Sequence, residues 1–254
     1  MTLFYKIMKL QQILCYVRKA IDDYQMIEEN DKIAIGISGG KDSLTLLCAL
    51  AALRRFYPKK FDIHAVTVDL GFKNLDLDAI KKFCKDLDVP YTIVKTDIAE
   101  IVFDIRKESN PCSLCSKMRK GALNEAITEL GCNKIAYAHH KDDVIETMML
   151  SLIYESRFHT FSPVTYLERA KLYVIRPMIY INEVDIKGFV RANNIPVVKS
   201  PCPADKHTKR EYVKELINGI NKEAPGVRYR MFTAVRSGNL QGWNKDNGEI
   251  DQLS

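Results

Sequence analysis

Short apolar runs alternate with longer amphipathic segments along most of this chain. The short runs are rich in β-branched residues and predict buried strands over residues 32–37, 61–70, 91–97, 133–140 and 172–178. Between them, apolar residues recur at helical spacing and predict helices over 43–56, 76–87, 115–130, 142–154 and 182–193. This alternation predicts a Rossmann-like α/β fold, in which helices cover both faces of a five-stranded parallel sheet.

The two ends of the chain depart from that alternation. Residues 1–30 predict an N-terminal amphipathic helix, whose apolar side packs either on the rest of the chain or on a second copy. Residues 31–200 form the predicted sheet domain, and residues 201–236 predict a small helical C-terminal segment. Residues 237–254 are polar and rich in Gly and Asn, which predicts disorder.

Composition narrows the class of protein. Of 254 residues, 46% are hydrophobic and 28% are charged, as in ordinary globular proteins. No apolar run reaches the ~18 residues of a membrane helix, and no small-residue cleavage site follows the N-terminal helix. We therefore expect a cytoplasmic protein without a membrane partner.

The net charge of +6 is compatible with a polyanionic partner. The basic residues gather late in the chain, either as a solvated face or as a surface that binds a phosphate backbone. They are Lys199, Lys206, Lys209, Arg210, Lys214, Arg228, Arg230 and Arg236.

The sequence SGGKDS at residues 38–43 lies between the first predicted strand and the next helix. Gly39 and Gly40 let the backbone approach a phosphate closely, and the helix start offers unpaired N–H groups. Ser38 and Ser43 add hydroxyl donors. A plain glycine turn is the alternative interpretation.

The spacing of this loop differs from that of the common P-loop, because Asp42 stands between Lys41 and Ser43. Lys41 adds a cation for the phosphates. Asp42 would repel them unless it binds Mg²⁺, which neutralises both. The loop therefore predicts a site for a nucleoside triphosphate with its metal ion.

The stretch resembles the SGGxDS signature of the PP-loop ATP pyrophosphatases, in which a substrate oxygen attacks the α-phosphate of ATP. The resemblance implies a catalytic role for Asp142, although Asp142 and Asp143 also fit a plain helix cap. It implies ATP contacts from the first loop, the end of the second strand and the loop after the fourth. These residues are Gly36, Ser38, Gly39, Gly40, Asp42, Ser43, Val68, Asp69, Ala138 and His139.

Three of the seven cysteines stand in contexts that suit a metal site. Cys112 and Cys115 are separated by two residues where a helix begins, and Cys202 lies between two prolines that fix its backbone. An iron–sulfur cluster with one open iron and a zinc site completed by His207 both fit these residues. An odd number of cysteines without a secretion signal makes a disulfide framework improbable.

PCSLC, HHKDD, VIRPM and the cysteine loop near position 200 together resemble the TtcA family, which makes 2-thiocytidine in tRNA. The resemblance covers about residues 9–236 and implies a [4Fe–4S] cluster on Cys112, Cys115 and Cys202. It also implies a homodimer and a sulfur donor such as a cysteine desulfurase or sulfide. One departure is Asp205, where many members carry a further cysteine.

The resemblance implies an ATP-dependent tRNA sulfurtransferase. The cytidine C2 oxygen would be adenylated with help from Lys41 and Mg²⁺, and sulfide on the open iron would then displace AMP. Arg119 would screen the phosphate or the RNA, or be a plain surface residue. The same chemistry on a small molecule or another tRNA nucleotide, a lysidine-forming ligase, and a nucleotide sensor with structural zinc are the competing hypotheses.

Overall fold

The computed structural model describes residues 2–72, 76–106, 111–198, 202, 209–243 and 251–253, with side chains between residues 10 and 243. Its helices are α1 Thr2–Asp23, α2 Lys41–Leu53, α3 Asp78–Asp86, π-helical η1 Glu100–Ile105, α4 Pro111–Glu129, α5 Lys141–Tyr154, α6 Glu183–Asn193, α7 Lys209–Glu223 and α8 Val227–Ser237. Its strands are β1 Asp31–Gly36, β2 Phe61–Asp69, β3 Tyr91–Lys95, β4 Lys134–Ala136, β5 Val164–Leu167, β6 Leu172–Ile175 and β7 Asp251–Leu253.

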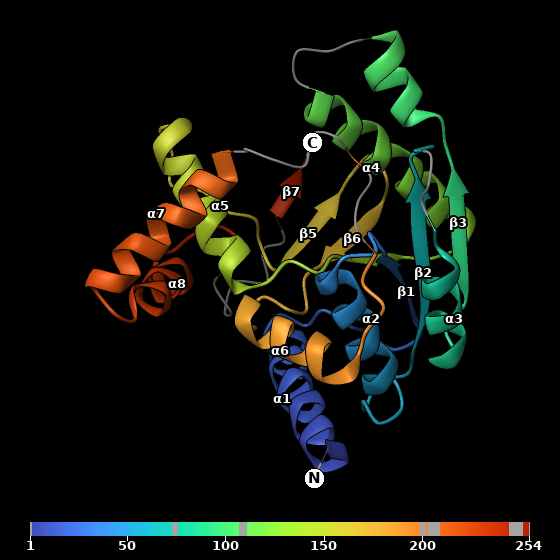
Figure 1. Cartoon of the computed structure of the whole chain (residues 1–254), viewed down its shortest axis with the longest axis horizontal. Helices are drawn as coiled ribbons and strands as arrows, with labels where there is room; N and C mark the ends of the chain where they lie inside the picture. The colour runs from blue at the N-terminus through green and yellow to red at the C-terminus, as the bar shows by residue number, and fades with distance from the viewer. Residues whose placement is uncertain are drawn as a thin grey trace.

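One sheet runs through the molecule in the order β3-β2-β1-β4-β6-β5-β7 (Figure 1). The five predicted strands, β1, β2, β3, β4 and β6, pair in parallel, which confirms the predicted α/β fold. The predicted strand number is corrected, because β5 joins β6 in antiparallel pairing and β7 pairs with β5.

The strand order reverses beside β1. The chain moves outward from β1 through β2 to β3, then returns to place β4 on the other side of β1. The loops after β1 and β4 therefore meet at the carboxyl ends of two adjacent parallel strands. Such a switch point is where open α/β sheets bind ligands.

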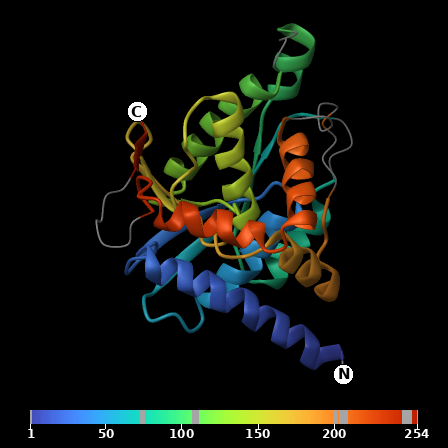
Figure 2. The same ribbon diagram turned by 90° about the vertical axis from the view of Figure 1, so that its left-hand side faces the viewer.

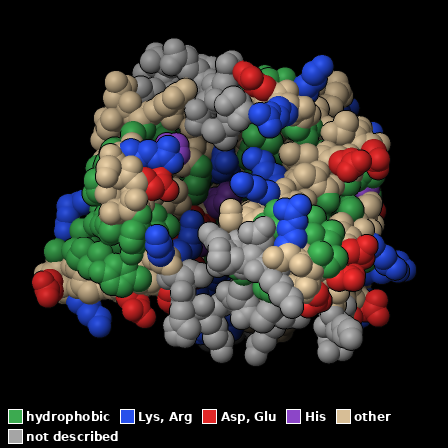
Figure 3. Space-filling view, turned by 90° about the horizontal axis from the view of Figure 1, so that it is seen from above, with side chains coloured by type: hydrophobic (Ala, Val, Ile, Leu, Met, Phe, Trp, Pro, Cys, Tyr) green, Lys and Arg blue, Asp and Glu red, His purple; other side chains and the backbone are tan. Residues whose placement is uncertain are grey.

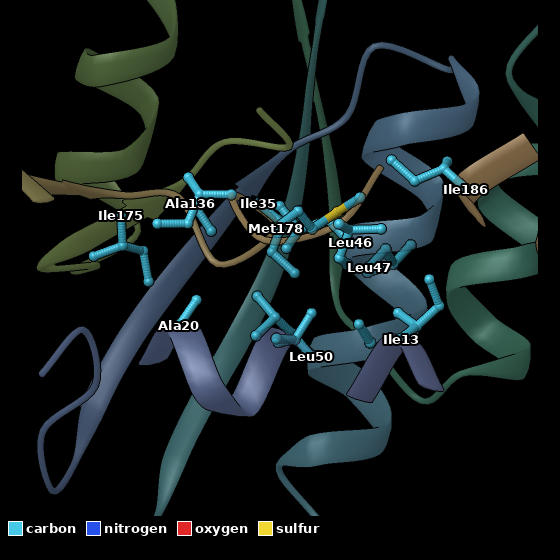
Figure 4. Packing of buried hydrophobic residues seen from close by; sticks show 14 of the residues in the cluster. Ile13, Ala20, Ile35, Leu46, Leu47, Leu50, Ala136, Ile175, Met178 and Ile186 are labelled. Carbon is cyan, nitrogen blue, oxygen red and sulfur yellow. The ribbon is translucent and has the colours of Figure 1, made fainter. Parts of the chain in front are cut away.

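Alternate residues of the strands feed two cores. Ile33 and Ile35 of β1 join the larger core with α1, α2, α5 and α6 (Figure 4). Ala34 of β1 and Val66 of β2 face the opposite side, where Leu123 and other residues of α4 cover the sheet. Successive strand residues point to opposite sides of the sheet. Since helices cover both sides, the buried strands are apolar on both.

The N-terminal helix packs on its own chain. Ile13, Val17, Ala20 and Ile21 of α1 are buried in the larger core, so from residue 10 onward the apolar side meets the same molecule rather than a second copy. In the described part of the chain, no helix is long and apolar enough to cross a membrane.

The C-terminal helices share the larger core with the sheet domain. Val213 of α7 and Phe232 of α8 are buried there, and both helices contact α5 (Figure 2). Trp243 is only 1% exposed, and its ring packs edge-on against Tyr24 and Phe232. The predicted disorder of 237–254 is therefore wrong for residues 237–243, and β7 contradicts it for 251–253. Residues 244–250 lie outside the described part.

Candidate active site

The loop between β1 and α2 turns sharply at Gly39, whose φ is +80°. A Cβ atom there would lie 3.3 Å from Ile80 and from Val198, so both conformation and space require glycine. Gly40 is the N-cap of α2. It has no side chain that could accept hydrogen bonds from the first N–H groups of the helix. Those groups and the positive end of the helix dipole are suited to an anion.

Two serines hold the loop in shape. The backbone N–H of Ser38 donates to Ser43 Oγ at 3.2 Å, and Ser43 Oγ donates to the Gly40 carbonyl at 3.0 Å. The N–H of Gly40 donates to Ser38 Oγ at 3.3 Å. The predicted serines and glycines therefore form one preorganised turn at the end of β1.

Lys41 and Asp42 follow the turn with opposite charges. Lys41 Nζ lies 2.8 Å from Asp42 Oδ2 and 3.2 Å from Glu183 Oε1 on α6. Burial acts to lower the pKa of Lys41, but the two carboxylates outweigh it and raise the pKa. Lys41 therefore remains a cation beside the open end of α2.

The second oxygen of Asp42 is buried and has no hydrogen-bond partner among the described residues. The nearest charged or titratable group given for it is His140, whose Nε2 is 3.8 Å away. A buried carboxylate oxygen without a donor is costly unless a cation binds it. This is the position where a metal ion would satisfy Asp42.

Aromatic rings line the part of the site formed by the loop after β4. A Cβ atom at Gly36 would lie 3.6 Å from the Tyr137 ring. The His139 ring stacks on Phe161 with centroids 4.6 Å apart, and Arg176 lies over Phe161 at 5.0 Å. Burial, with the charge of Arg176, lowers the pKa of His139 to about 4, so this imidazole is neutral at physiological pH.

Other predicted nucleotide contacts lie at the same edge of the sheet. Ala138 is half-buried in the loop after β4. Val68 and Asp69 end β2, just beyond the part of the strand that pairs with β1, and both are half-buried. Asp69 Oδ1 accepts the N–H of Gly71 at 3.0 Å, so the end of β2 has a fixed turn.

Asp142 joins three helices. One oxygen of this buried carboxylate accepts from Arg228 of α8 at 2.5 Å, and the other accepts the N–H of Glu183 of α6 at 2.7 Å. Asp142, which lies on another helix, therefore caps the start of α6. The side chain of Asn182, the N-cap residue of α6, makes no capping hydrogen bond. Asp143 matches the helix-cap interpretation, because its Oδ2 accepts the N–H of His140 at 2.9 Å.

The three predicted cysteines lie in one neighbourhood, and none forms a disulfide. Helix α4 begins at Pro111, earlier than predicted, so Cys112 and Cys115 both lie within its opening turns. Burial raises the pKa of Cys115; the charge of Arg119 opposes the rise, and those of Cys202 and Cys112 add to it. His207 and Asp205 lie outside the described residues.

Two connections join the cysteines to the first loop. Leu123 on α4 lies 3.6 Å from the Cβ position of Gly36, so the helix that carries Cys112 and Cys115 packs against the end of β1. The N–H of Val198 donates to the Gly39 carbonyl at 3.0 Å. Cys202 follows Val198 by four residues, so its Cα lies within about 14 Å of that of Val198.

Several basic residues of the C-terminal segment are paired with acids. Arg210 lies 2.8 Å from Asp143, and Lys214 lies 3.1 Å from Glu183. With Arg228 on Asp142, these pairs dock α7 and α8 on the site rather than form a free solvated face. The upper face of the molecule is hollowed at its middle, with Lys, Arg and His side chains visible inside (Figure 3).

Three residues of the site were absent from the sequence analysis as candidates: Glu183, Arg176 and Tyr137. Tyr137 directly precedes the predicted Ala138 and His139, so its proximity was a usable signal. Glu183 contacts Lys41 across a long stretch of chain, and no local pattern indicates that contact.

Comparison with known proteins agrees with this geometry. The family model of the PP-loop domain matches residues 10–220. The tRNA-cytidine(32) 2-sulfurtransferase of Syntrophotalea carbinolica is 37% identical over 242 residues, covering 94% of this chain and 90% of the relative. Its counterpart from Geobacter sulfurreducens is 35% identical over 228 residues, covering 89% and 88%.

A solved structure agrees as well. The U34-tRNA thiolase NcsA from Methanococcus maripaludis with its [4Fe-4S] cluster superposes with a TM-score of 0.75 at 26% identity, covering 93% of this chain and 81% of that one. The chain belongs to the PP-loop domain family and, within it, to the family of the tRNA-cytidine(32) 2-sulfurtransferases.

Proposed function

We propose that this protein is an ATP-dependent tRNA sulfurtransferase that converts a cytidine, at position 32 as in its relatives, to 2-thiocytidine. One observation carries the proposal. An anion-binding loop and a group of three cysteines are tied together by the Val198–Gly39 hydrogen bond and by the packing of α4 on Gly36. A nucleotide-binding protein without sulfur chemistry needs no such arrangement.

The first loop binds the phosphates of ATP. The N–H groups at the start of α2 and the Lys41 ammonium bind the phosphate oxygens, and Ser38 and Ser43 keep the turn in place. Asp42 holds Mg²⁺ through the buried oxygen that has no donor among the described residues. The ends of β2 and β4 flank the nucleoside part.

Cys112, Cys115 and Cys202 hold a [4Fe–4S] cluster, as NcsA does in its solved structure. The donor set fits: Cys112 and Cys202 both lie close enough to act on the pKa of the Cys115 thiol, and thiolates are the ligands that hold iron–sulfur clusters. When bound, the cluster supplies an iron without a protein ligand, which can carry the sulfur to be transferred.

The protein positions two displacements. The C2 oxygen of the cytidine attacks the α-phosphate and pyrophosphate leaves, with charge stabilised by Lys41 and the α2 N–H groups. Sulfide then forms a bond to C2, the C2–O bond breaks, and AMP leaves with the adenylated oxygen. Asp142 holds the start of α6 and the Arg228 side chain of α8 in register beside the reacting base. Arg119 lies near Cys115 and supplies positive charge for the departing phosphate.

The proposal extends to the partners. The enzyme acts on tRNA in the cytoplasm and receives sulfur from a donor such as a cysteine desulfurase or sulfide. We also propose a homodimer. The apolar side of α1 packs internally. The dimer interface therefore uses exposed residues such as Phe56, which lies beside α1 and is 55% exposed.

The test is analysis of tRNA nucleosides by mass spectrometry after anaerobic reaction with ATP, Mg²⁺ and sulfide. We expect 2-thiocytidine with wild type and with Cys15→Ser, which changes an exposed cysteine outside the group of three. We expect none with Cys115→Ser, none without ATP, and none on tRNA whose cytidine 32 is replaced by uridine. Hydrolysis of ATP with no thiolated nucleoside would overturn the proposal.

A further inference from the structure

Glu183, the first residue of α6, binds three ammonium groups. Its carboxylate lies 3.2 Å from Lys41, 3.0 Å from Lys187 and 3.1 Å from Lys214. The side chain is 15% exposed. Burial acts to raise the pKa of Glu183, but the three lysines outweigh it and lower the pKa to about 2. The carboxylate is therefore ionised under all working conditions.

The position of Glu183 is itself fixed. Its N–H donates to Asp142 Oδ2 at 2.7 Å, and Asp142 is held from the other side by Arg228. Lys214 of α7 and Lys187, one turn along α6, bind the Glu183 carboxylate from other directions. Both the backbone N–H and the carboxylate of Glu183 are therefore held in place, and the residue is a rigid anchor for a further group.

Lys41 is that group. Among the described residues, the acids paired with its ammonium are Asp42 and Glu183. Asp42 belongs to the same loop as Lys41, whereas Glu183 reaches the ammonium from another helix. Lysine has a long flexible side chain whose ordering costs rotamer entropy, so an anchor that orders it in advance favours the reaction.

We infer that Glu183 is a positioning residue, which holds the Lys41 ammonium in place for the transferring phosphate. The inference rests on the proposed function and adds a residue that the loop motif does not contain. It has an unusual consequence for ATP binding. Removing the Glu183 charge leaves more net positive charge near the phosphates, so ATP binding does not weaken, while the unanchored Lys41 is misplaced for the reaction.

The experiment compares Glu183→Gln, Glu183→Asp, Lys41→Ala and the Glu183→Gln/Lys41→Ala double variant. Calorimetry with a non-hydrolysable ATP analogue and Mg²⁺ gives affinity and stoichiometry, and single-turnover AMP formation with tRNA gives the rate. For Glu183→Gln we expect a rate about tenfold lower, with unchanged stoichiometry and unweakened affinity. Glu183→Asp, which keeps the charge, should recover part of the rate.

The double variant separates positioning from folding. If Glu183 acts through Lys41, Glu183→Gln causes no further loss of rate in the Lys41→Ala background. Arg191→Ala, at an exposed position of the same helix and outside the ion pairs of Glu183, should match wild type. An equal loss in both backgrounds, or a loss of binding stoichiometry, would overturn the inference. Absence of tRNA-dependent AMP formation by wild type would instead overturn the proposed function.

Discussion

The backbone N–H of Val198 donates a hydrogen bond to the carbonyl of Gly39 at 3.0 Å. Gly39 lies in the loop proposed to bind phosphates, and Val198 lies four residues before Cys202. This hydrogen bond joins the loop to the segment that leads to the third cysteine, and it makes several expectations specific.

Gly39→Ala should impair both folding and activity. The φ of +80° costs an L-residue roughly 1–2 kcal/mol, and the added Cβ would press on Ile80 and Val198 at 3.3 Å. Gly40→Ala is the matched control, because its φ is −77° and its Cβ would meet only Ser38 Oγ, at 3.4 Å. Urea unfolding should show a loss for Gly39→Ala and near wild-type stability for Gly40→Ala. Equal stabilities would contradict the assigned strain.

Asp142→Asn should lower the rate of thiolation by about a hundredfold, because Asp142 joins α6 to α8 and carries charge at the crevice. Arg228→Met should lower it only a few-fold, since the carboxylate and its bond to Glu183 remain. Arg230→Met is the control on the same helix, because Arg230 binds only the carbonyls of Pro225 and Ala224 in the described contacts.

The comparison of these variants decides what Asp142 does. The measurement is the single-turnover rate of tRNA thiolation by each variant. If Asp142→Asn and Arg228→Met lose activity to the same extent, Asp142 acts by anchoring α8 and has no role of its own in the reaction.

Glu146→Gln should stabilise the protein in a pH-dependent way. Burial raises the pKa of Glu146 from 4.5 to about 7 in the folded state. The folded chain therefore holds more protons between those values, and wild type loses stability as pH rises from about 4.5 to 7. Glutamine does not ionise, so it avoids this loss. The difference in free energy of unfolding between Glu146→Gln and wild type should therefore grow across this window by up to roughly 3 kcal/mol.

Urea unfolding at pH 4.5, 6 and 7.5 measures this difference. Glu129→Gln at an exposed position of α4 should show no such growth. An advantage of Glu146→Gln that stays constant with pH would refute the assignment.

The parallel strands and the first loop were predictable because their signals are local. Apolar β-branched runs such as Ile33–Ile37 are buried on both faces, and SGGKDS follows directly. β5 was missed because it joins β6 in antiparallel pairing, outside the alternation of strand and helix that indicated the parallel strands. Disorder was predicted for the tail because the segment as a whole is polar. One of its residues, Trp243, nevertheless fills a position in the core.

The charge network was not predictable for a related reason. Asp142 meets Glu183 across 41 positions and Arg228 across 86 positions of sequence. Each residue in isolation is an ordinary polar position on a helix. Only the packing of α5, α6 and α8 brings them together, and a single sequence carries no periodic signal for such packing.

The central claim is that Cys112, Cys115 and Cys202 bind an iron–sulfur cluster beside the ATP loop. The direct measurement is iron, acid-labile sulfide and zinc content after strictly anaerobic purification of wild type, Cys202→Ala and the control Cys15→Ala. We predict about four irons and four sulfides per chain in wild type and in the control, and their loss in Cys202→Ala. One zinc per chain without sulfide would contradict the account and leave an adenylating enzyme or a nucleotide sensor on the same loop.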